Sequence, residues 1–328
     1  MRIVLCCRGY PTQRPGGMLF ICRDRAVELA KNHEVHVLTT GHTSRRSGTV
    51  DGVLVHHLKC KPLAYTTQFA EQCSTFCKRM KPDIIHCDSV DPSRLWWKDL
   101  KCKKALTVHG FCIGGFLTNW NLHRICKGPA PKFDASKWME EVRAFKSFHT
   151  VIGTSIHEQW LLKDPMGIHN AKLVYNPIPN YFFDQPKSLP TTPKFLCAAV
   201  SQRGLRLFDV AVQAAKEAGI DLVESSNTLR HKMPELYDSV SALLVPSARS
   251  SGYDLTVGEA LARCRPVITS TTGSYLREGE HSPYIIPTAL GNKVELVKLM
   301  KSELPVVPQG YANKHRPEEH VKNWLEAI

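Results

Sequence analysis

The chain has 328 residues, of which 43% are hydrophobic and 22% charged, and its formal net charge is +13. This length suits two domains of ordinary size, and the composition is typical of a soluble globular protein. No stretch approaches the roughly 18 apolar residues of a membrane-spanning helix, so no such helix is predicted. The opening MRIVLCCRGYP has too short an apolar run for a signal peptide and predicts a first strand instead.

Segments that alternate between strand-like and helical patterns predict βαβ units and parallel sheets. In the first half, strands are expected at 2–7, 35–38, 53–58, 83–87, 105–109, 149–153 and 172–175, with helices at 18–32, 69–80, around Trp96 and at 138–145. The sequence NPIP at 176–179 breaks this rhythm and is the candidate linker. In the second half, strands are expected at 195–199, 221–223, 242–245 and 267–269, with helices at 205–218, 256–263 and 318–328. The pattern predicts two Rossmann-like domains with a cleft between them, at 1–178 and 179–315, and a closing helix at 316–328.

Twelve cysteines are present, and ten of them precede residue 127. Several stand inside apolar segments, namely Cys6, Cys7, Cys87 and Cys197, as buried free thiols do. Cys73 and Cys77 have helical spacing but no nearby set of His or Cys partners, so a zinc site is not predicted. Free thiols in this number favour a reducing cytoplasm.

Positive charge is concentrated in the first half of the chain. Residues 1–180 hold 26 Lys and Arg against 14 Asp and Glu, whereas the remainder holds 17 against 16. Such asymmetry predicts a polyanionic partner for the first domain, which could be nucleic acid, an anionic membrane or an acidic small molecule. The candidate contact residues are Arg45, Arg46, Lys98, Lys101, Lys103 and Lys104, with Trp96, Trp97 and Trp120 among them. Cations interleaved with aromatic residues suit both DNA and anionic lipid.

The segment 246–268, PSARSSGYDLTVGEALARCRPVI, carries the most specific pattern in the sequence. A short strand ends at Pro246, a polar loop follows with Gly252 at its tip, and a helix carries Glu259. This arrangement places backbone N–H groups and a helix N-terminus at the carboxyl edge of a sheet, where phosphates bind. Thr256 and Glu259 also have the spacing of a capping box, which is the purely structural interpretation of the same residues.

This segment resembles the donor-site signature of retaining GT-B glycosyltransferases of the family-4 (group 1) type. The residues in register are Pro246, Ser247, Gly252, Leu255, Glu259, Ala260, Ala262, Pro266 and Val267. Further similar segments follow in the order of the family: GYPTQRPGG, HEVHVLT, KPDIIHCDS, LTVHG, LVYNPIPNYFF and MPELYDSVSALLVPS. The chain departs from the signature at Ser251, where the family has its first glutamate, and at Tyr253, Asp254 and Cys264.

The resemblance implies an α/β GT-B fold whose second domain is trimmed, because the interval before MPELY is short. It implies that Glu259 accepts the ribose hydroxyls of a nucleotide-sugar, that Arg203 binds the diphosphate, and that Gly16 and Gly17 let the first loop approach the donor. His109 and Asp254 are the expected catalytic contacts to the sugar, beside Ser251, Gly252 and Tyr253 in the loop. Ala198 and Ala199 replace a basic family motif, so Arg249 is a further candidate phosphate cation. The alternative interpretation of Arg249, a solvated cation of the loop, is slightly favoured. No D-x-D motif is present, so neither a metal nor another cofactor is expected, and a UDP-sugar is the expected co-substrate.

The predicted function is therefore retaining glycosyl transfer to a polyanionic acceptor. A hydroxylated base in phage DNA is favoured narrowly, because the basic residues are spread along the chain rather than confined to one helix. An anionic membrane lipid or a polysaccharide precursor is the first alternative. A degenerate glycosyltransferase that serves as a binding protein is the second, and the loss of the glutamate at position 251 motivates it.

Overall fold

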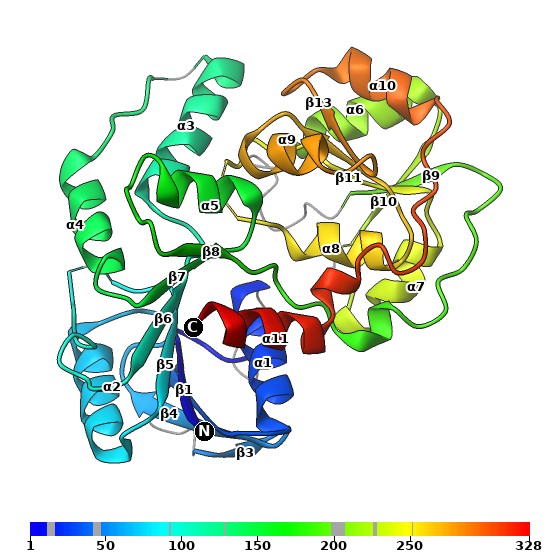
Figure 1. The fold of residues 1–328 in the computed structure, drawn as a ribbon. Helices are drawn as coiled ribbons and strands as arrows, with labels where there is room; N and C mark the ends of the chain where they lie inside the picture. Colours follow the sequence, from blue (N-terminus) through cyan, green and yellow to red (C-terminus); the bar gives the residue numbers. More distant parts are fainter. Residues whose placement is uncertain are drawn as a thin grey trace.

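The computed structural model describes residues 1–11, 17–41, 47–91, 93–127, 129–197, 207–225, 228–250 and 252–328. Within these residues the chain forms two sheets that lie side by side (Figure 1). The first has the strand order β3-β4-β2-β1-β5-β6-β7-β8, and the second has the order β10-β9-β11-β12-β13. Every strand pair is parallel except β3 with β4. The two sheets with their helices are the two Rossmann-like domains that the sequence predicts.

The first sheet reverses its strand order at its centre. Its strands are β1 (Arg2–Cys7), β2 (Glu34–Gly41), β3 (Gly48–Val50), β4 (Val53–Lys59), β5 (Ile84–Asp88), β6 (Lys103–Thr107), β7 (Thr150–Gly153) and β8 (Ala171–Leu173). β1 lies between β2 and β5, so the chain builds outward from β1 in one direction and from β5 in the other. A crevice for ligands forms outside the carboxyl ends of the strands at such a switch point.

Alternate side chains of β1 pack into two separate hydrophobic cores, one on each face of the first sheet. Val4 and Cys6 pack under α2 (Thr67–Met80), α4 (Ala135–Phe145) and α5 (Ile156–Lys163). Ile3, Leu5 and Cys7 pack under α1 (Gly17–Ala30) and α11 (Pro317–Ala327). The remaining helix, α3 (Cys112–Cys126), follows β6 at the carboxyl edge of the sheet. A strand buried on both faces explains the continuous apolar run RIVLCC.

The second sheet is built in the same way from shorter strands. These are β9 (Lys194–Cys197), β10 (Asp221–Glu224), β11 (Ala242–Val245), β12 (Val267–Ser270) and β13 (Ile285–Thr288). Its helices are α6 (Phe208–Ala218), α7 (Met233–Asp238), α8 (Leu255–Ala262), α9 (Gly273–Glu280) and α10 (Lys293–Met300). One face packs against α7, α8 and α9, and the other against α6 and α10. Short 3₁₀ turns stand at Asn180–Phe182, Arg230–Lys232 and Asn313–His315.

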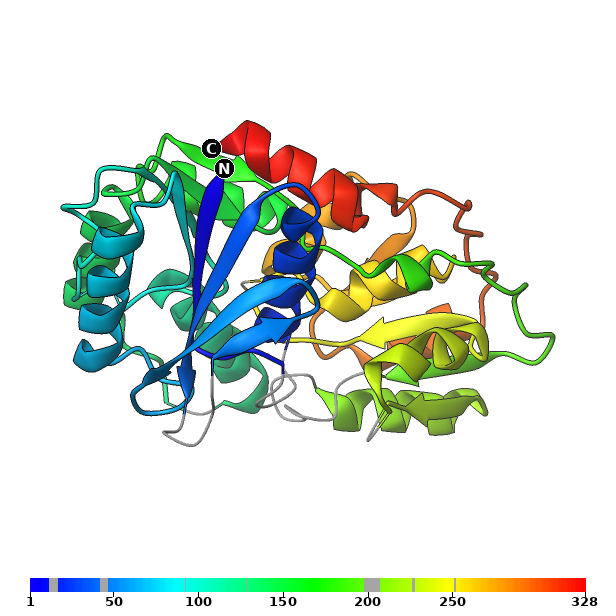
Figure 2. The ribbon, with the colours of Figure 1, turned by 90° about the horizontal axis from the view of Figure 1, so that it is seen from below.

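The chain passes between the two domains twice, and the two passages are hydrogen-bonded to each other. The amide of Ile178 donates to the carbonyl of His315 at 2.7 Å, and the His315 ring lies 3.0 Å from the carbonyl of Asn176. After the second passage, α11 returns to the first domain and packs beside α1 (Figure 2). The buried Trp324 indole of α11 donates to His86 Nδ1 at 3.0 Å.

The strands predicted from sequence are confirmed to within a few residues at each end, and so are most of the predicted helices. The helix expected around Trp96 is wrong, because this region forms turns. The Asp91 carboxylate accepts hydrogen bonds from Ser93 and Arg94, and such local bonds compete with helix formation. α3, α5, α7, α9 and α10 are not among the predicted helices. The short interval before MPELY, which led to the prediction of a trimmed second domain, contains α6 and β10.

All twelve cysteines are free, and the four expected in the core are buried. Among the described residues, none of the helices is both long and apolar enough to span a membrane.

Candidate active site

The N-termini of two helices from different domains lie next to each other at the carboxyl edges of the sheets. α1 begins at Gly17 and α8 begins at Leu255. A Cβ atom on Gly17 would lie 3.7 Å from Leu255 Cδ1, so the two helix starts are in near contact. Unpaired backbone N–H groups and the helix dipole make such a place favourable for anions. Gly17 thus lies where the sequence predicts it, whereas Gly16 is outside the described residues.

Glu259 is a buried carboxylate in the first turns of α8. Its Oε1 lies 3.5 Å from Arg230 Nε, and its Oε2 accepts a hydrogen bond from the Tyr237 hydroxyl at 3.2 Å. Burial raises the pKa of Glu259, while Arg230 and the Tyr237 hydroxyl oppose that rise. The capping-box interpretation is wrong, because Asp254 occupies the N-cap position and Glu259 bonds to other elements. The buried carboxylate is thus held between the two domains by residues outside its own helix.

Arg230 is a functional candidate that the sequence analysis missed. Its Nη1 donates to Asp24 Oδ2 at 2.8 Å, and its guanidinium lies 4.4 Å from the centre of the Phe20 ring. Asp24 and Phe20 belong to α1 of the first domain, so this side chain joins the two domains. No local pattern points to this role, because the Arg230–Asp24 contact joins residues 206 positions apart in the sequence.

His109 follows β6 and lies at the carboxyl edge of the first sheet, as the sequence predicts. Its Nε2 is 3.1 Å from Asp88 Oδ1, and Arg25 Nη1 donates to the same oxygen at 2.9 Å. Burial alone would raise the pKa of Asp88, but Arg25, His109 and His86 hold it well below its ordinary value. The Asp88 carboxylate is therefore an anionic anchor that fixes the His109 ring at the carboxyl edge of the first sheet.

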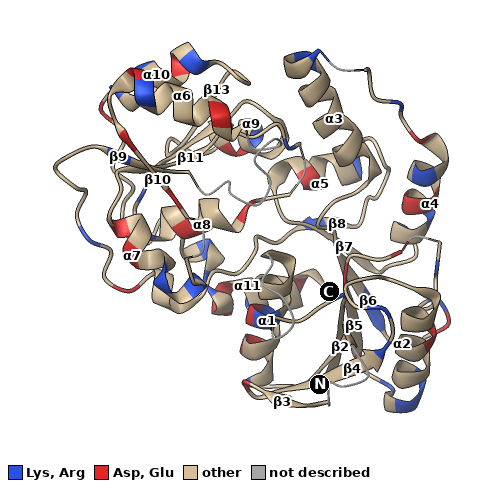
Figure 3. Cartoon of the chain, turned by 180° about the vertical axis from the view of Figure 1, so that it is seen from behind, with Lys and Arg blue, Asp and Glu red and all other residues tan. Residues whose placement is uncertain are grey.

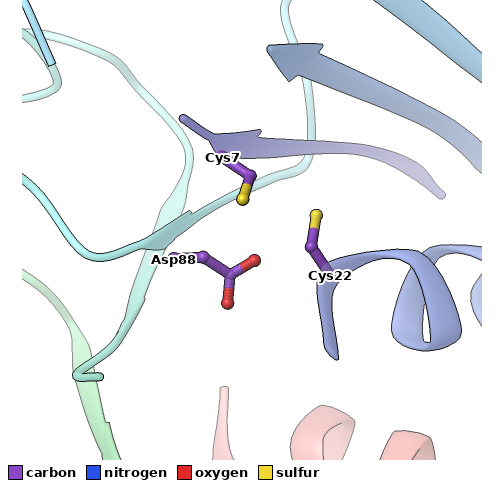
Figure 4. A group of neighbouring side chains, drawn as sticks. All are labelled: Cys7, Cys22 and Asp88. Atoms are coloured by element: carbon purple, nitrogen blue, oxygen red, sulfur yellow. The ribbon is translucent and has the colours of Figure 1, made fainter. Parts of the chain in front are cut away.

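The Asp88 carboxylate also belongs to a compact buried group with Cys7 and Cys22 (Figure 4). Their ligand atoms lie within 4.8 Å of one another, as in a metal site. The Arg25 guanidinium already neutralises the carboxylate, and its charge opposes a second cation there. The pKa of the Cys22 thiol is raised by the neighbouring Cys7 and by burial, which favours the protonated form that binds metals poorly. We therefore assign the group to the core, and metal-free chemistry stays a prediction.

The loop 246–254 is held from the first domain by α3 and α5. Asn121 donates to the carbonyl of Ala248 at 3.0 Å, and the amide of Ser250 donates to Thr118 Oγ1 at 3.0 Å. Gly252 adopts the left-handed conformation with φ +86°, which glycine accepts without strain, and its amide donates to Glu158 Oε1 at 2.8 Å. Glu158 was not predicted, because only the tertiary structure brings α5 to this loop.

The Asp254 carboxylate and the Tyr253 ring, which are expected to contact the donor, have partners within the protein, whereas the buried Tyr253 hydroxyl has no hydrogen-bond partner among the described residues. Asp254 accepts a hydrogen bond from the Tyr275 hydroxyl and forms an ion pair with Arg249 at 3.4 Å. The Tyr253 ring is buried and stacks on His315, with 5.4 Å between ring centres. A donor contact from Tyr253 would therefore have to come from its backbone. Arg203 and Ser251 lie outside the described residues.

The predicted lysine cluster lies at the opposite edge of the first sheet from His109. Lys98, Lys101 and Lys103 are exposed near the amino end of β6, whereas His109 follows its carboxyl end. At roughly 3.3 Å per residue, this separation is about 20 Å. Lys104 is buried, and its Nζ donates to the carbonyl of Lys98 at 3.0 Å. The structure therefore does not bring this cluster to the cleft, and Arg45 and Arg46 lie outside the described residues.

An aromatic and basic surface on α3 and α4, which the sequence analysis did not assemble, adjoins the loop instead. Four of its rings form a chain: Phe116 lies 6.2 Å from Trp120 and 5.3 Å from Phe133, which lies 5.9 Å from Trp138. Trp120 is 42% exposed and Phe133 is 41% exposed. We call this the α3–α4 surface, and its exposed cations are Arg124, Lys127, Lys132 and Lys137.

Solved structures with this arrangement of two domains are GT-B glycosyltransferases. The sucrose-phosphate synthase of Thermosynechococcus elongatus matches with 14% identity and a TM-score of 0.71, over 99% of this chain and 94% of that one. Anabaena HepE in complex with UDP matches with 12% identity and a TM-score of 0.71, over 99% of each chain. The lipopolysaccharide outer core galactosyltransferase WaaB matches with 13% identity and a TM-score of 0.67, over 100% of this chain and 99% of that one. The fold is therefore GT-B.

The family model of Glycosyltransferase Family 4 matches residues 15–180, just over half of the chain. The chain belongs to Glycosyltransferase Family 4, and the resemblance inferred from the sequence is confirmed at this level. No curated protein sequence matches it.

Proposed function

We propose that this protein is a retaining glycosyltransferase that moves a sugar from a nucleotide-sugar, with a UDP-sugar as the expected donor, to a polyanionic acceptor. The observation that carries the donor assignment is the buried Glu259 carboxylate beside the adjoining starts of α1 and α8. An ionised carboxylate accepts the two hydroxyls of a ribose, and the helix starts favour the diphosphate. The UDP bound to HepE, which shares the fold, supports the same choice.

The residues of the cleft suit a reaction in which the leaving diphosphate itself takes the proton of the acceptor hydroxyl. The bond from the sugar to the diphosphate breaks while the acceptor oxygen attacks from the same face. In such a transfer the protein has to position both substrates and stabilise charge on the departing diphosphate. His109, fixed by Asp88, would contact the sugar, and Glu259 would hold the nucleoside.

The α3–α4 surface is the acceptor platform of this proposal. α3 contacts the loop 246–254 through Thr118 and Asn121, while Phe116 and Trp120 lie on its aromatic side. Figure 3 shows Lys and Arg at the end of α3, and Lys and Arg next to Asp and Glu on α4, apart from the basic group near β6. Exposed rings between cations suit nucleobases and phosphates, so a hydroxylated base in DNA is the favoured acceptor. An anionic lipid is the alternative outcome of the test.

The donor assignment is tested by Glu259→Gln, with the exposed Glu235→Gln as the matched control. A neutral amide accepts at one oxygen only, so UDP binding should weaken about ten- to a hundredfold, the loss of roughly 1.5–3 kcal/mol for a hydrogen bond to a charged group. Titration calorimetry with UDP, GDP and ADP measures this, and unfolding curves check that the variant folds. Wild-type affinity in Glu259→Gln would refute the assignment. UDP-sugar binding without hydrolysis or transfer would make the chain a binding protein.

A further inference from the structure

We infer that Arg230 is a positioning residue for the nucleotide, and that its anchor on Asp24 makes donor binding depend on a contact across the cleft. This inference rests on the proposed role of Glu259 in binding the donor. It assigns a function to a basic residue that lies outside the matched donor signature.

Arg230 stands at the start of a 3₁₀ turn and reaches both domains from there. Its short bond, at 2.8 Å, goes to Asp24 on α1, and its longer contact, at 3.5 Å, goes to Glu259 on α8. The Phe20 ring, one turn before Asp24, covers one face of the guanidinium. Arg230 is thus held more tightly by Asp24 of the first domain than by Glu259 of the second, the carboxylate that it positions.

One nitrogen of this guanidinium has no hydrogen-bond partner among the described residues. Arg230 Nη2 is buried and makes no hydrogen bond to any described residue, although Nη1 and Nε both have acceptors. A buried N–H without an acceptor is costly, so such groups usually face a ligand or water. A phosphate or ribose oxygen of a nucleotide held by Glu259 would supply the missing acceptor. An arginine also suits this contact because its planar fork can bind two acceptors at once.

The charges around Glu259 give Arg230 a second effect. Three ionisable groups face Glu259: Arg230 of the 3₁₀ turn, Tyr237 of α7 and Asp24 of α1. Tyr181 lies close to the same cluster. Burial and the charge of Asp24 raise the pKa of Glu259, and Arg230 is the cation that opposes them. Without Arg230, two carboxylates would face each other, and Glu259 would take up a proton at a higher pH. A protonated Glu259 accepts ribose hydroxyls poorly, so nucleotide binding would weaken on acidification earlier than in the wild type.

The experiment measures the dissociation constant of UDP by titration calorimetry between pH 5 and 8. The variants are Arg230→Gln, Arg230→Lys and Asp24→Asn, with Arg94→Gln and the exposed Asp99→Asn as matched controls. Arg230→Gln and Asp24→Asn should each weaken UDP binding roughly tenfold, the loss expected for one hydrogen bond to a charged group, while both controls bind as the wild type does. Arg230→Lys should keep the wild-type pH profile, because it keeps the charge, and Arg230→Gln should shift that profile toward higher pH.

A double variant separates positioning from a general loss of stability. Asp24→Asn with Arg230→Gln should bind UDP no more weakly than Arg230→Gln alone, because both changes remove one shared contact. Wild-type affinity in Asp24→Asn, or an unshifted pH profile in Arg230→Gln, would overturn this inference while leaving the donor site in place. Wild-type affinity in Glu259→Gln, or no nucleotide binding by the native protein, would instead remove the proposed function on which it rests.

Discussion

Asp254 stands where the family signature has glycine, and it brings a carboxylate into a loop that has lost its glutamate at position 251. In the structure its two oxygens face Tyr275 and Arg249, so the carboxylate is held in place rather than left in solvent. A fixed carboxylate costs little to position when substrate arrives. The prediction that it contacts the sugar therefore stays open to a direct test.

Replacing Asp254 with Asn should reduce sugar transfer far more than it reduces binding of UDP. A contact to a sugar hydroxyl is absent when only the leaving group is bound, and its loss is worth about ten- to a hundredfold in rate. The measurement pairs initial rates with UDP calorimetry, and Tyr275→Phe serves as the control that loosens the carboxylate but keeps its charge. Full transfer by Asp254→Asn would show that the sugar is held without this carboxylate.

The site residues that could be predicted are those within a contiguous motif. Glu259 and His109 follow strands in recognisable segments, and the structure places both at the carboxyl edges of the sheets. Arg230 and Glu158 could not be predicted, because each acts on an element far away in sequence. The lysines near 101 were misjudged for a different reason. Their charge was visible in the sequence, but the direction of β6 carries them away from the cleft.

At the scale of elements, α3 decides where an acceptor could lie. It was not predicted, because its pattern lacks the usual signals of a helix. Two glycines stand in its first turn, Phe111 at the N-cap offers no side-chain bond, and Gly114 and Thr118 alone are its buried residues. Because so few of its side chains are buried, α3 is stabilised by its contacts with the loop 246–254 and α4, and its aromatic side stays exposed.

Reversing the charge of two cations on this surface should weaken acceptor binding. The double variant Arg124→Glu with Lys127→Glu is expected to lower the affinity for DNA. It should also reduce the number of counterions released on binding by about two, and so flatten the salt dependence, because each cation that binds a phosphate releases roughly one counterion. The matched control is Lys101→Glu with Lys103→Glu, which makes the same change of charge at the far edge of the sheet. Fluorescence anisotropy with duplex DNA at several salt concentrations measures both.

Equal losses in the two pairs would show that only the overall charge matters, and the α3–α4 surface would then have no special role. Binding to vesicles of anionic lipid but not to DNA would replace the proposed acceptor with a membrane lipid. UDP binding should be unchanged in both pairs, which shows that the fold is intact.

At the scale of the whole molecule, buried histidines govern the response to acid. Burial lowers the pKa of His86 and His157 to about 4 and that of His315 to about 3, from an ordinary value of 6.5. The unfolded chain therefore takes up these protons below pH 6.5, whereas the folded chain does not until pH 3 to 4. The stability they support is present above pH 6.5 and is lost progressively as the pH falls toward those values.

Replacing His315 with Asn should make the protein less sensitive to acid. The asparagine amide can keep the donor to the Asn176 carbonyl, and it cannot take up a proton. Between pH 7 and pH 5, the variant should lose up to about 2 kcal/mol less free energy of unfolding than the wild type. Urea unfolding at the two pH values measures this, with the exposed His281→Asn as the control. An identical loss in His315→Asn and the wild type would contradict the prediction.

The overall architecture was largely predictable, because buried parallel strands produce apolar runs that are visible without the structure. The way the two domains join was not. Asn176–Pro179 looks like an ordinary linker in the sequence, and only the structure shows that it pairs with the segment around His315.

That pairing limits how the two halves can move. A single connection would let one half rotate in any direction, but two neighbouring connections restrict the rotation to one axis. Opening of the cleft is therefore expected to be a rotation about the line through residues 176–178 and 315, with little sliding or twisting. Residues close to such an axis barely move, while those far from it travel furthest. The Asp24–Arg230 contact joins the two halves, as do the bonds of Asn121, Thr118 and Glu158 to the loop 246–254, and all of them must part when the halves rotate. Together these contacts favour the closed arrangement.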